Sequence, residues 1–313
     1  MSRASVTSSA AIEERRVEVD GLSTHYLSAG HGPPMLLLHG DGESAFDWRR
    51  VIPAFAEHHR VLAPSLPGHG NSARWDGDHS PRFFAGFIRA FLTTVDAKNA
   101  TIVGNSLGGA IAVRYALEHS AAVPALVLVD SLGLGREINR LPALQIIPGL
   151  GELSIALSRT RLGASVYTRT RARFAFADPS HAPGDWLAEQ RRLARLRGVL
   201  ASSLAAKREV IRLHGQKALI LDALPRLNMP TLVLWGENDR LLPPAHAHTA
   251  AARLPAGRAA VIPGAGHLPQ LEHPERFIAT VLGFLHEPAC QNTDDICNAT
   301  PQASVGAPSR RSQ

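Results

Sequence analysis

Short apolar runs alternate with stretches of helical length along most of the chain, and this alternation restricts the choice of fold. The run Met35-Leu36-Leu37-Leu38 has no alternating polar positions, which is typical of a strand buried on both faces of a sheet. Similar runs recur at 60–65, 100–104, 125–130, 231–236 and 258–263. Helix-length stretches separate them at 46–59, 81–95, 107–119, 244–254 and 274–286. The pattern predicts an α/β fold with a mostly parallel central sheet and helices on both faces.

Two features complete the predicted organisation of the chain. Residues 16–29 alternate as two strands joined by an Asp20-Gly21 turn. Residues 130–230 are rich in Leu, Ala and Arg, have apolar residues at helical spacing, and lack strand-like runs. We therefore expect a helical insertion between two parts of one core. The predicted boundaries are a flexible leader at 1–15, the core at 16–132 and 223–287, the helical insertion at 133–222 and a disordered tail at 288–313.

Composition excludes several classes of protein. The chain has 313 residues, of which 45% are hydrophobic and 19% charged, so it can bury a large core. No apolar run approaches the roughly 20 residues that cross a membrane, and residues 1–11 lack the apolar segment of a signal peptide, so we expect a cytoplasmic protein. The only cysteines are Cys290 and Cys297, which excludes a disulfide scaffold and a four-cysteine zinc site.

The net charge of +6 is concentrated in the helical insertion. Residues 151–220 hold 13 Lys and Arg against 5 Asp and Glu, a local balance of +8, so the rest of the chain is slightly acidic. No nucleic-acid motif accompanies this charge, and we expect neither a nucleic-acid partner nor membrane contact. Attachment of the insertion to an anionic membrane is the alternative.

The strongest chemical signal is Gly104-Asn105-Ser106-Leu107-Gly108-Gly109, which follows a predicted strand and precedes a predicted helix. A serine in such a sharp turn has a strained backbone, and the residues two before and two after it must be small. The turn lifts the hydroxyl above the sheet, and the helix N-terminus behind it favours negative charge. We therefore interpret Ser106 as a nucleophile, and the alternative is an ordinary glycine-rich turn.

A second loop, His39-Gly40-Asp41-Gly42, follows the first buried strand. It can aim a backbone N–H at a developing oxyanion. We expect the N–H groups of Asp41 and Leu107 to form this oxyanion hole, with Gly42 in place of Asp41 if the loop is shifted. His39 is interpreted as structural, holding the loop by hydrogen bonds.

A base and an acid complete the predicted site. His267 lies in the glycine-rich loop Gly264-Ala265-Gly266-His267 after the last strand, where a mobile turn can bring an imidazole to the serine. Asp239 ends a buried strand with a polar turn and is predicted to orient His267 and stabilise its charged form. Glu237 and Asp130, the latter at the end of an earlier strand, are the alternatives for the acid.

The order Ser106, Asp239, His267, each on the loop after its own strand, resembles the α/β-hydrolase fold superfamily in its serine-nucleophile branch. The resemblance extends over about residues 17–286 and includes Leu66-Pro67-Gly68-His69-Gly70, which is similar to a loop motif of that family. It implies that the helical insertion is a cap domain (lid). A serine nucleophile implies esterases, thioesterases, lactonases and related hydrolases rather than dehalogenases or epoxide hydrolases.

Asn105 also gives a weaker resemblance to the meta-cleavage-product C–C hydrolases, although Asp41-Gly42-Glu43 and Leu268 depart from their pattern. We expect a carboxylesterase-like hydrolase, with a C–C hydrolase acting on a diketo acid as the alternative and a non-catalytic small-molecule binding protein as a third. The substrate is expected to be a small ester or acyl compound. No cofactor and no metal are required, and the oligomeric state is left open.

Residues from the turn and from the helical insertion are the candidates for substrate binding. Arginines of the insertion either form a solvated surface or pair with a substrate carboxylate or phosphate. The candidates for such pairing are Arg169, Arg171, Arg173 and the cluster at 191–197. The residues assigned to substrate binding are Asn105, Leu268, Arg171 and Arg173.

Overall fold

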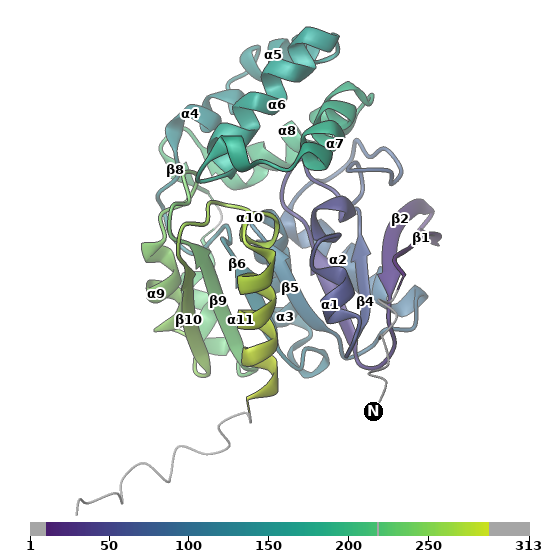
Figure 1. The fold of residues 1–313 in the computed structure, drawn as a ribbon, viewed down its shortest axis with the longest axis vertical. Coiled ribbons are helices and arrows are strands. Elements are labelled where there is room, and N and C mark those ends of the chain that lie inside the picture. Colours follow the sequence, from purple (N-terminus) through teal and green to yellow (C-terminus); the bar gives the residue numbers. More distant parts are fainter. Residues whose placement is uncertain (1–10, 218, 288–313) are drawn as a thin grey trace, which may run out of the picture.

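An eight-stranded sheet forms the centre of the protein (Figure 1). The structure is a computed structural model and describes residues 11–217 and 219–287, so the predicted tail, Cys290, Cys297 and residues 1–10 of the leader lie outside the described residues. The strand order is β1-β2-β4-β3-β5-β6-β9-β10. β2 pairs antiparallel with both β1 and β4, and every pair from β4 to β10 is parallel. The predicted fold class is confirmed.

The strands lie close to their predicted positions. Their bounds are β1 (Glu13–Val19), β2 (Leu22–Ala29), β3 (Pro34–Leu38), β4 (Arg60–Pro64), β5 (Thr101–Asn105), β6 (Leu126–Val129), β9 (Thr231–Gly236) and β10 (Gly257–Ile262). The chain turns between β1 and β2 at Asp20 and Gly21, both with positive φ. β1 begins at Glu13, inside the segment predicted as a leader, because its charged residues pair along an edge where both side-chain faces remain accessible.

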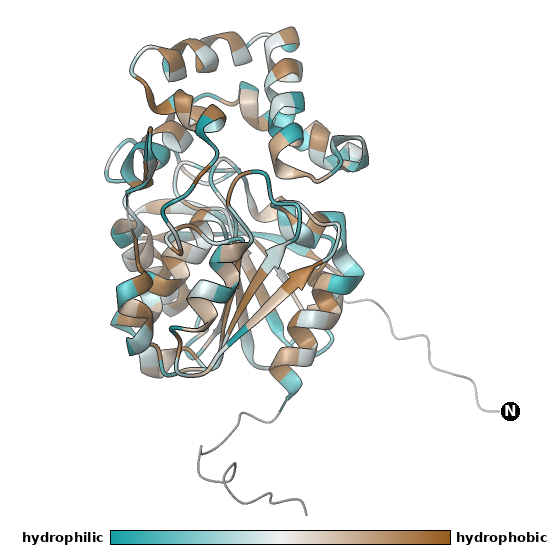
Figure 2. Cartoon of the chain, turned by 90° about the vertical axis from the view of Figure 1, so that its left-hand side faces the viewer, coloured by the Kyte–Doolittle hydropathy of each residue, from teal (hydrophilic) through white to brown (hydrophobic). Residues whose placement is uncertain are grey.

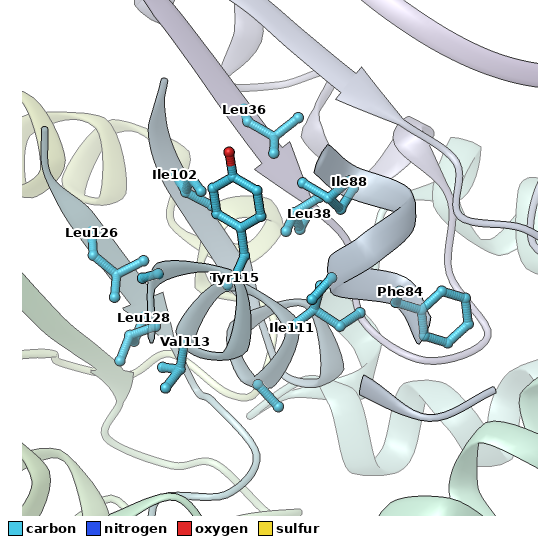
Figure 3. Packing of buried hydrophobic residues seen from close by; sticks show 14 of the residues in the cluster. Leu36, Leu38, Phe84, Ile88, Ile102, Ile111, Val113, Tyr115, Leu126 and Leu128 are labelled. Atoms are coloured by element: carbon cyan, nitrogen blue, oxygen red, sulfur yellow. The ribbon is translucent and has the colours of Figure 1, made fainter. Parts of the chain in front are cut away.

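Helices cover both faces of the sheet, because successive residues of a buried strand point to opposite sides. Leu36 and Leu38 of β3 pack with α2 (Pro81–Thr94), α3 (Leu107–Glu118) and α9 (Ala245–Ala251). Met35 and Leu37 pack on the other face with α1 (Ile52–Phe55) and α11 (Pro274–His286). Figure 3 shows the strand residues Leu36, Ile102 and Leu126 in one cluster with Ile88 of α2 and Ile111 of α3.

The order of the strands places a topological switch point between β3 and β5. The chain runs from β3 to β4 on one side and then crosses to β5 on the other side. Loops that leave the carboxyl ends of two such strands diverge, and the crevice between them is where open α/β sheets bind ligands. Leu38 pairs with Gly104 at this edge, so the loops that begin at His39 and at Ser106 start side by side.

One predicted helix is wrong. Residues 46–59 form the short 3₁₀ turn η1 (Ala45–Trp48) and the four-residue helix α1. Pro53 lies in the first turn of α1, and a proline at that position has no N–H to donate to the preceding turn and clashes with it, so a continuous helix is broken there.

The segment between β6 and β9 is helical, as expected, and lies at one end of the molecule (Figure 1). Its helices are α4 (Arg140–Ala143), η3 (Leu144–Ile146), α5 (Leu150–Ser158), α6 (Arg161–Ala175), η4 (Pro179–His181), α7 (Gly184–Arg195), α8 (Val199–Val210) and η5 (Leu221–Arg226). It also contains a small antiparallel pair, β7 (Ile211–Arg212) and β8 (Gly215–Gln216). No strand was predicted in this segment because it lacks apolar runs. Within the described ranges no single helix is long and apolar enough to cross a membrane, and only the pair Arg140–Ile146 and Leu150–Ser158, bent by 92°, passes that test together.

Gly104 should be intolerant of any side chain. A Cβ there would lie 2.4 Å from the carbonyl oxygen of Gly108, which is backbone and cannot rotate away. We expect Gly104→Ala to lower the free energy of unfolding by about 1–3 kcal/mol, the usual range for overpacking. The control is Gly86→Ala in α2, where a Cβ meets nothing within 4 Å and where alanine should raise stability by up to about 1 kcal/mol. Urea denaturation of both variants measures the difference, and equal effects would contradict this account.

Candidate active site

The turn after β5 holds Ser106 in a strained conformation. Its φ is 54° and its ψ −114°, a combination that few non-glycine residues adopt. The Ser106 N–H donates to the Val129 carbonyl at 2.9 Å, and the Ser106 carbonyl accepts from the N–H of Leu132 at 3.1 Å, so strand β6 and its loop fix the turn. Gly108 is required because a Cβ there would lie 2.3 Å from the Leu38 carbonyl oxygen. The packing therefore agrees with the predicted reason for Gly104 and Gly108, which is that a side chain at either position would clash with nearby backbone.

His267 and Asp239 form a buried pair. Nδ1 of His267 lies 2.8 Å from Oδ2 of Asp239, and the two side chains are 7% and 0% exposed. The other oxygen of Asp239 accepts the N–H groups of Leu241 and Leu242 at 2.7 and 3.1 Å. These bonds hold the carboxylate, so Nδ1 of His267 carries the proton toward it and Nε2 is left to act as a base. Glu237, an alternative acid, instead accepts the N–H of Gly264.

Asp130, the other alternative acid, lies in the same cluster. One oxygen of Asp130, one of Asp239 and a ring nitrogen of His267 all lie within 4.8 Å of one another. Asp130 accepts the Gly236 N–H at 2.9 Å through Oδ1, whereas its Oδ2 is buried without a partner. Burial, followed by the nearby charge of Asp239, raises the pKa of Asp130 well above its usual range. A proton on Oδ2 would give that oxygen Asp239 as a partner, which is why we assign the neutral form to Asp130.

Among the described residues, these three are the group whose arrangement most resembles a metal-binding site. Three of their four carboxylate oxygens and one ring nitrogen are already engaged in hydrogen bonds. The cluster is therefore better understood as a hydrogen-bonded carboxyl pair beside an imidazole, and the expectation of a metal-free site stays a prediction.

The loop that carries His267 is held by residues whose role sequence patterns did not indicate. Nδ2 of Asn105 donates to the His267 carbonyl at 3.1 Å, and the His267 N–H donates to Ala175 at the end of α6. Glu272 accepts the N–H groups of Gly266 and Ala177 at 2.7 and 3.0 Å. Asn105 is therefore a positioning residue through its amide nitrogen, although its Oδ1 is buried without a partner and its side chain lines the cavity.

Two backbone N–H groups are available beside Ser106. A Cβ on Gly40 would lie 3.3 Å from Cβ of Ser106, so the loop after β3 passes directly beside the serine. The Asp41 N–H has no backbone acceptor in the part of the chain that the structure describes, and Leu107 is the first residue of α3, whose N–H has no partner inside the helix. A Cβ on Gly42 would point at Arg171 and Ser203 of the insertion, and the assignment of the donor to Asp41, with Gly42 as the alternative, stays a prediction. His39 holds the loop as predicted, with Nδ1 2.7 Å from the Gly40 carbonyl and Nε2 accepting the Leu66 N–H.

Ser106 and His267 lie in the wall of one cavity of about 290 Å³ between the sheet and the helical insertion. Most of its wall is apolar. The apolar residues are Leu132, Ile138, Leu141, Pro142, Ala143, Phe174, Ala175, Val210, Ile211, Leu241, Leu242 and Leu268. The predicted contact residue Leu268 is among them, so substrate would meet a mainly hydrophobic surface.

Four charged groups also line the cavity, and they form two pairs of opposite charge. Arg171 forms an ion pair with Glu43, and Lys207 lies 3.4 Å from Oδ2 of Asp41. Burial by itself would raise the pKa of both Glu43 and Asp41. The charge of Arg171 outweighs burial at Glu43 and lowers the pKa of that carboxyl. The charge of Lys207, followed by His69 and Arg171, lowers the pKa of Asp41 to about 2. Both carboxyls are thus ionised, and the cavity wall carries no excess charge. Lys207 and Glu43 were not among the predicted contacts.

Arg173 does not line the cavity, contrary to the prediction. Arg171 reaches inward, but Arg173 is exposed. The reason is that two residues separated by two positions in a helix point in directions about 200° apart. Arg169 is also exposed, as are Arg191, Arg192, Arg195 and Arg197. Most of the arginine-rich insertion is therefore a solvated surface, and one arginine faces the pocket.

Comparison with known proteins agrees with this geometry. A family model described as the α/β hydrolase fold matches residues 33–274. The chain belongs to the α/β-hydrolase family. An uncharacterized protein of Mycobacterium tuberculosis is 32% identical over 277 residues, which cover 87% of this chain and 81% of that protein.

Relatives within the family differ in their reactions. A 2-hydroxy-6-oxo-6-(2'-aminophenyl)hexa-2,4-dienoic acid hydrolase of Metapseudomonas resinovorans is 32% identical over 285 residues, 89% of this chain and 92% of that protein. Among solved structures, a membrane phospholipase A described as a bacterial virulence factor has a TM-score of 0.73 at 26% identity and covers 88% of this chain and 86% of its own. Family membership therefore establishes an α/β hydrolase but does not identify the bond that it cleaves.

The two carboxyls of this hydrolase should respond differently to amidation. Asp239→Asn removes the charge that orients His267, and we expect turnover to fall on the order of 10⁴-fold. Asp130→Asn replaces a neutral carboxyl by a neutral amide that can still accept the Gly236 N–H, so turnover should change little. The measurement is kcat on one soluble substrate, with circular dichroism as a check of folding. A large loss in Asp130→Asn together with a small loss in Asp239→Asn would transfer the role of the acid to Asp130.

Proposed function

We propose that this protein is a serine hydrolase that cleaves carboxylic esters of apolar groups through an acyl-enzyme. Ser106 is the nucleophile, His267 the general base and Asp239 the residue that orients it. The observation that carries the proposal is that Ser106 and His267 line a mostly apolar cavity whose cations already have acidic partners.

The pairing of charges bears on the choice of substrate. A substrate carboxylate gains most from an arginine or lysine whose charge is uncompensated. Here Arg171 is paired with Glu43, and Glu43 is held further by Nε2 of Gln190 at 2.7 Å. Lys207 is placed between Asp41 and Oε1 of Gln145, 2.9 Å away. An anionic substrate would have to displace one of these partners, whereas a neutral ester would not.

In the proposed reaction, Oγ of Ser106 bonds to the ester carbonyl carbon while its proton passes to Nε2 of His267. The N–H groups of Asp41 and Leu107 stabilise the negative oxygen, each contributing about 3 kcal/mol if they match donors of this kind. Collapse of the intermediate breaks the bond to the alcohol, which leaves with the proton from His267. Water, which gives a proton to His267, then attacks the acyl carbon. The bond from that carbon to Oγ of Ser106 breaks, the carboxylic acid leaves, and His267 returns the proton to Ser106.

Cleavage of a carbon–carbon bond in a diketo acid is the second candidate. The similarity to the dienoic acid hydrolase of Metapseudomonas resinovorans, over 92% of its length, favours it. Its substrate carries a carboxylate, so it requires that Arg171 or Lys207 be released from its acidic partner. A non-catalytic binding protein on this fold is the third candidate, and a binding role does not account for the strained backbone of Ser106.

A comparison of three substrates separates these candidates. We expect kcat/KM for a neutral medium-chain ester to exceed that for the same ester with a terminal carboxylate by about tenfold or more, because burying an uncompensated charge is costly. Ser106→Ala should abolish both activities. Turnover of a diketo-acid dienol without turnover of either ester would establish the second candidate, and no turnover of any of the three would support the third.

The charge pairing can be tested by removing one acid. Glu43→Gln leaves the Arg171 guanidinium without its carboxylate, so we expect activity on the carboxylate ester to rise relative to the neutral ester by about tenfold. The matched control is Glu209→Gln, which removes an exposed acid from α8 of the same insertion. If the ratio of the two activities is the same in both variants, the paired charges do not determine substrate choice.

A further inference from the structure

Exposed apolar side chains are gathered on the helical insertion. In the described part of the chain, every large hydrophobic side chain that is exposed lies between residues 141 and 219. Seven of the nine lie on or beside α4, η3, α5 and α6. They are Leu141, Leu144, Leu150, Leu153, Leu157, Leu162 and Val166. Figure 2 shows apolar segments along these outermost helices, at the end of the molecule away from the core helices.

The leucines of α5 and α6 occur at helical spacing. Leu150, Leu153 and Leu157 are three and four residues apart and therefore share one face of α5. On α6, Leu162, which is 76% exposed, and Val166 are four residues apart. The two helices pack against each other, so their outer faces are neighbours. We call this surface, with Leu141 and Leu144, the leucine face. A group of exposed apolar side chains of this kind on a folded protein is typical of an interaction site.

The charges around the leucine face are almost all positive. Exposed arginines flank it at positions 140, 159, 161, 169 and 173. The one acidic residue of α4–α6, Glu152, is already paired with Arg208 of α8. Apolar side chains bordered by arginines are typical of helices that lie in the interface of an anionic bilayer, where the leucines enter the acyl region and the arginines meet phosphates.

We propose that the leucine face docks on an anionic lipid surface. A second copy of the chain is the other apolar partner to consider, but a two-fold contact uses the same surface of both copies and would bring one arginine-bordered face against another. Lipid phosphates neutralise these arginines instead. Neither the α4–η3 segment nor α5 is long enough to span a bilayer alone, and the two are bent by 92° from each other, so in this proposal the face lies along the membrane surface. The proposal revises the expectation that this protein makes no membrane contact.

The leucine face is continuous with the cavity. Leu141 is 65% exposed and is also part of the cavity wall, and Thr170 of α6 is both exposed and part of that wall. Docking would therefore bring the cavity mouth to the lipid, so that an apolar ester could enter without crossing water. This last step rests on the proposed function, whereas docking itself does not.

Flotation of the full chain with vesicles tests the proposal. We expect binding to vesicles of phosphatidylglycerol and phosphatidylcholine, weaker binding to phosphatidylcholine alone, and weaker binding at roughly 0.5 M NaCl, where surface charges are screened. Leu153→Glu with Leu157→Glu should weaken binding by about tenfold or more, because two apolar anchors become charged. Hydrolysis of a soluble ester should be unchanged, since neither leucine lines the cavity.

Charge reversals supply a matched pair of variants. Arg161→Glu with Arg169→Glu, beside the leucine face, should weaken binding to anionic vesicles by about tenfold or more. Arg191→Glu with Arg195→Glu changes the net charge equally on α7, where both arginines are exposed, and should have a smaller effect. Ser106→Ala should bind as the unchanged protein does, so that docking is measured even if the proposed hydrolysis fails.

The proposal is overturned by any of three results. The first is that the unchanged protein stays with the unbound fraction on every vesicle. The second is that the two arginine pairs weaken binding equally, which would indicate attraction by net charge alone. The third is a dimer, seen by analytical ultracentrifugation, that the Leu153→Glu, Leu157→Glu variant dissociates. That result would assign the leucine face to a second copy of the chain.

Discussion

The strained backbone of Ser106 is the constraint on which the rest of the structure depends. A φ of 54° is maintained only because β5 and β6 fix both sides of the turn and because Gly104 and Gly108 leave room for backbone to approach backbone. The same turn ends a central strand and begins α3, so the sheet and the serine are positioned together. Without the buried parallel sheet, nothing would hold the hydroxyl at this edge.

Four loops from different strands meet at that edge because parallel strands present their carboxyl ends together. The pairing of β5 with β6, β6 with β9 and β9 with β10 aligns the ends from which Ser106, Asp130, Asp239 and His267 follow. Buried polar groups then connect the loops, as the bonds of Asp239 and Asn105 to the His267 loop illustrate. The helical insertion closes the site and supplies Arg171 and Lys207, whose charges are balanced by acids of the loop after β3.

Much of this could be predicted from local sequence patterns. The strands were predictable because buried parallel strands are apolar without interruption, and Ser106 because a serine between glycines, after a strand and before a helix, is typical of a nucleophile. Arg171 points inward and Arg173 outward because of how α6 is rotated about its axis relative to the cavity. The number of charged residues in the segment does not reveal that rotation. Glu43 and Lys207 lie 164 residues apart in the sequence and line the same cavity only because of the placement of the insertion. The leucine face was missed for a similar reason, since periodic leucines in a helix usually mark a buried side.

The central claim is that the fold makes Ser106 a nucleophile, and covalent labelling tests it most directly. The folded protein should react with a fluorophosphonate at one site, and peptide mapping should place the adduct on Ser106. Labelling should be lost in Ser106→Ala and after denaturation, since it depends on His267 and the oxyanion donors being in place. An adduct on another residue, or no adduct in the folded protein, would contradict the account.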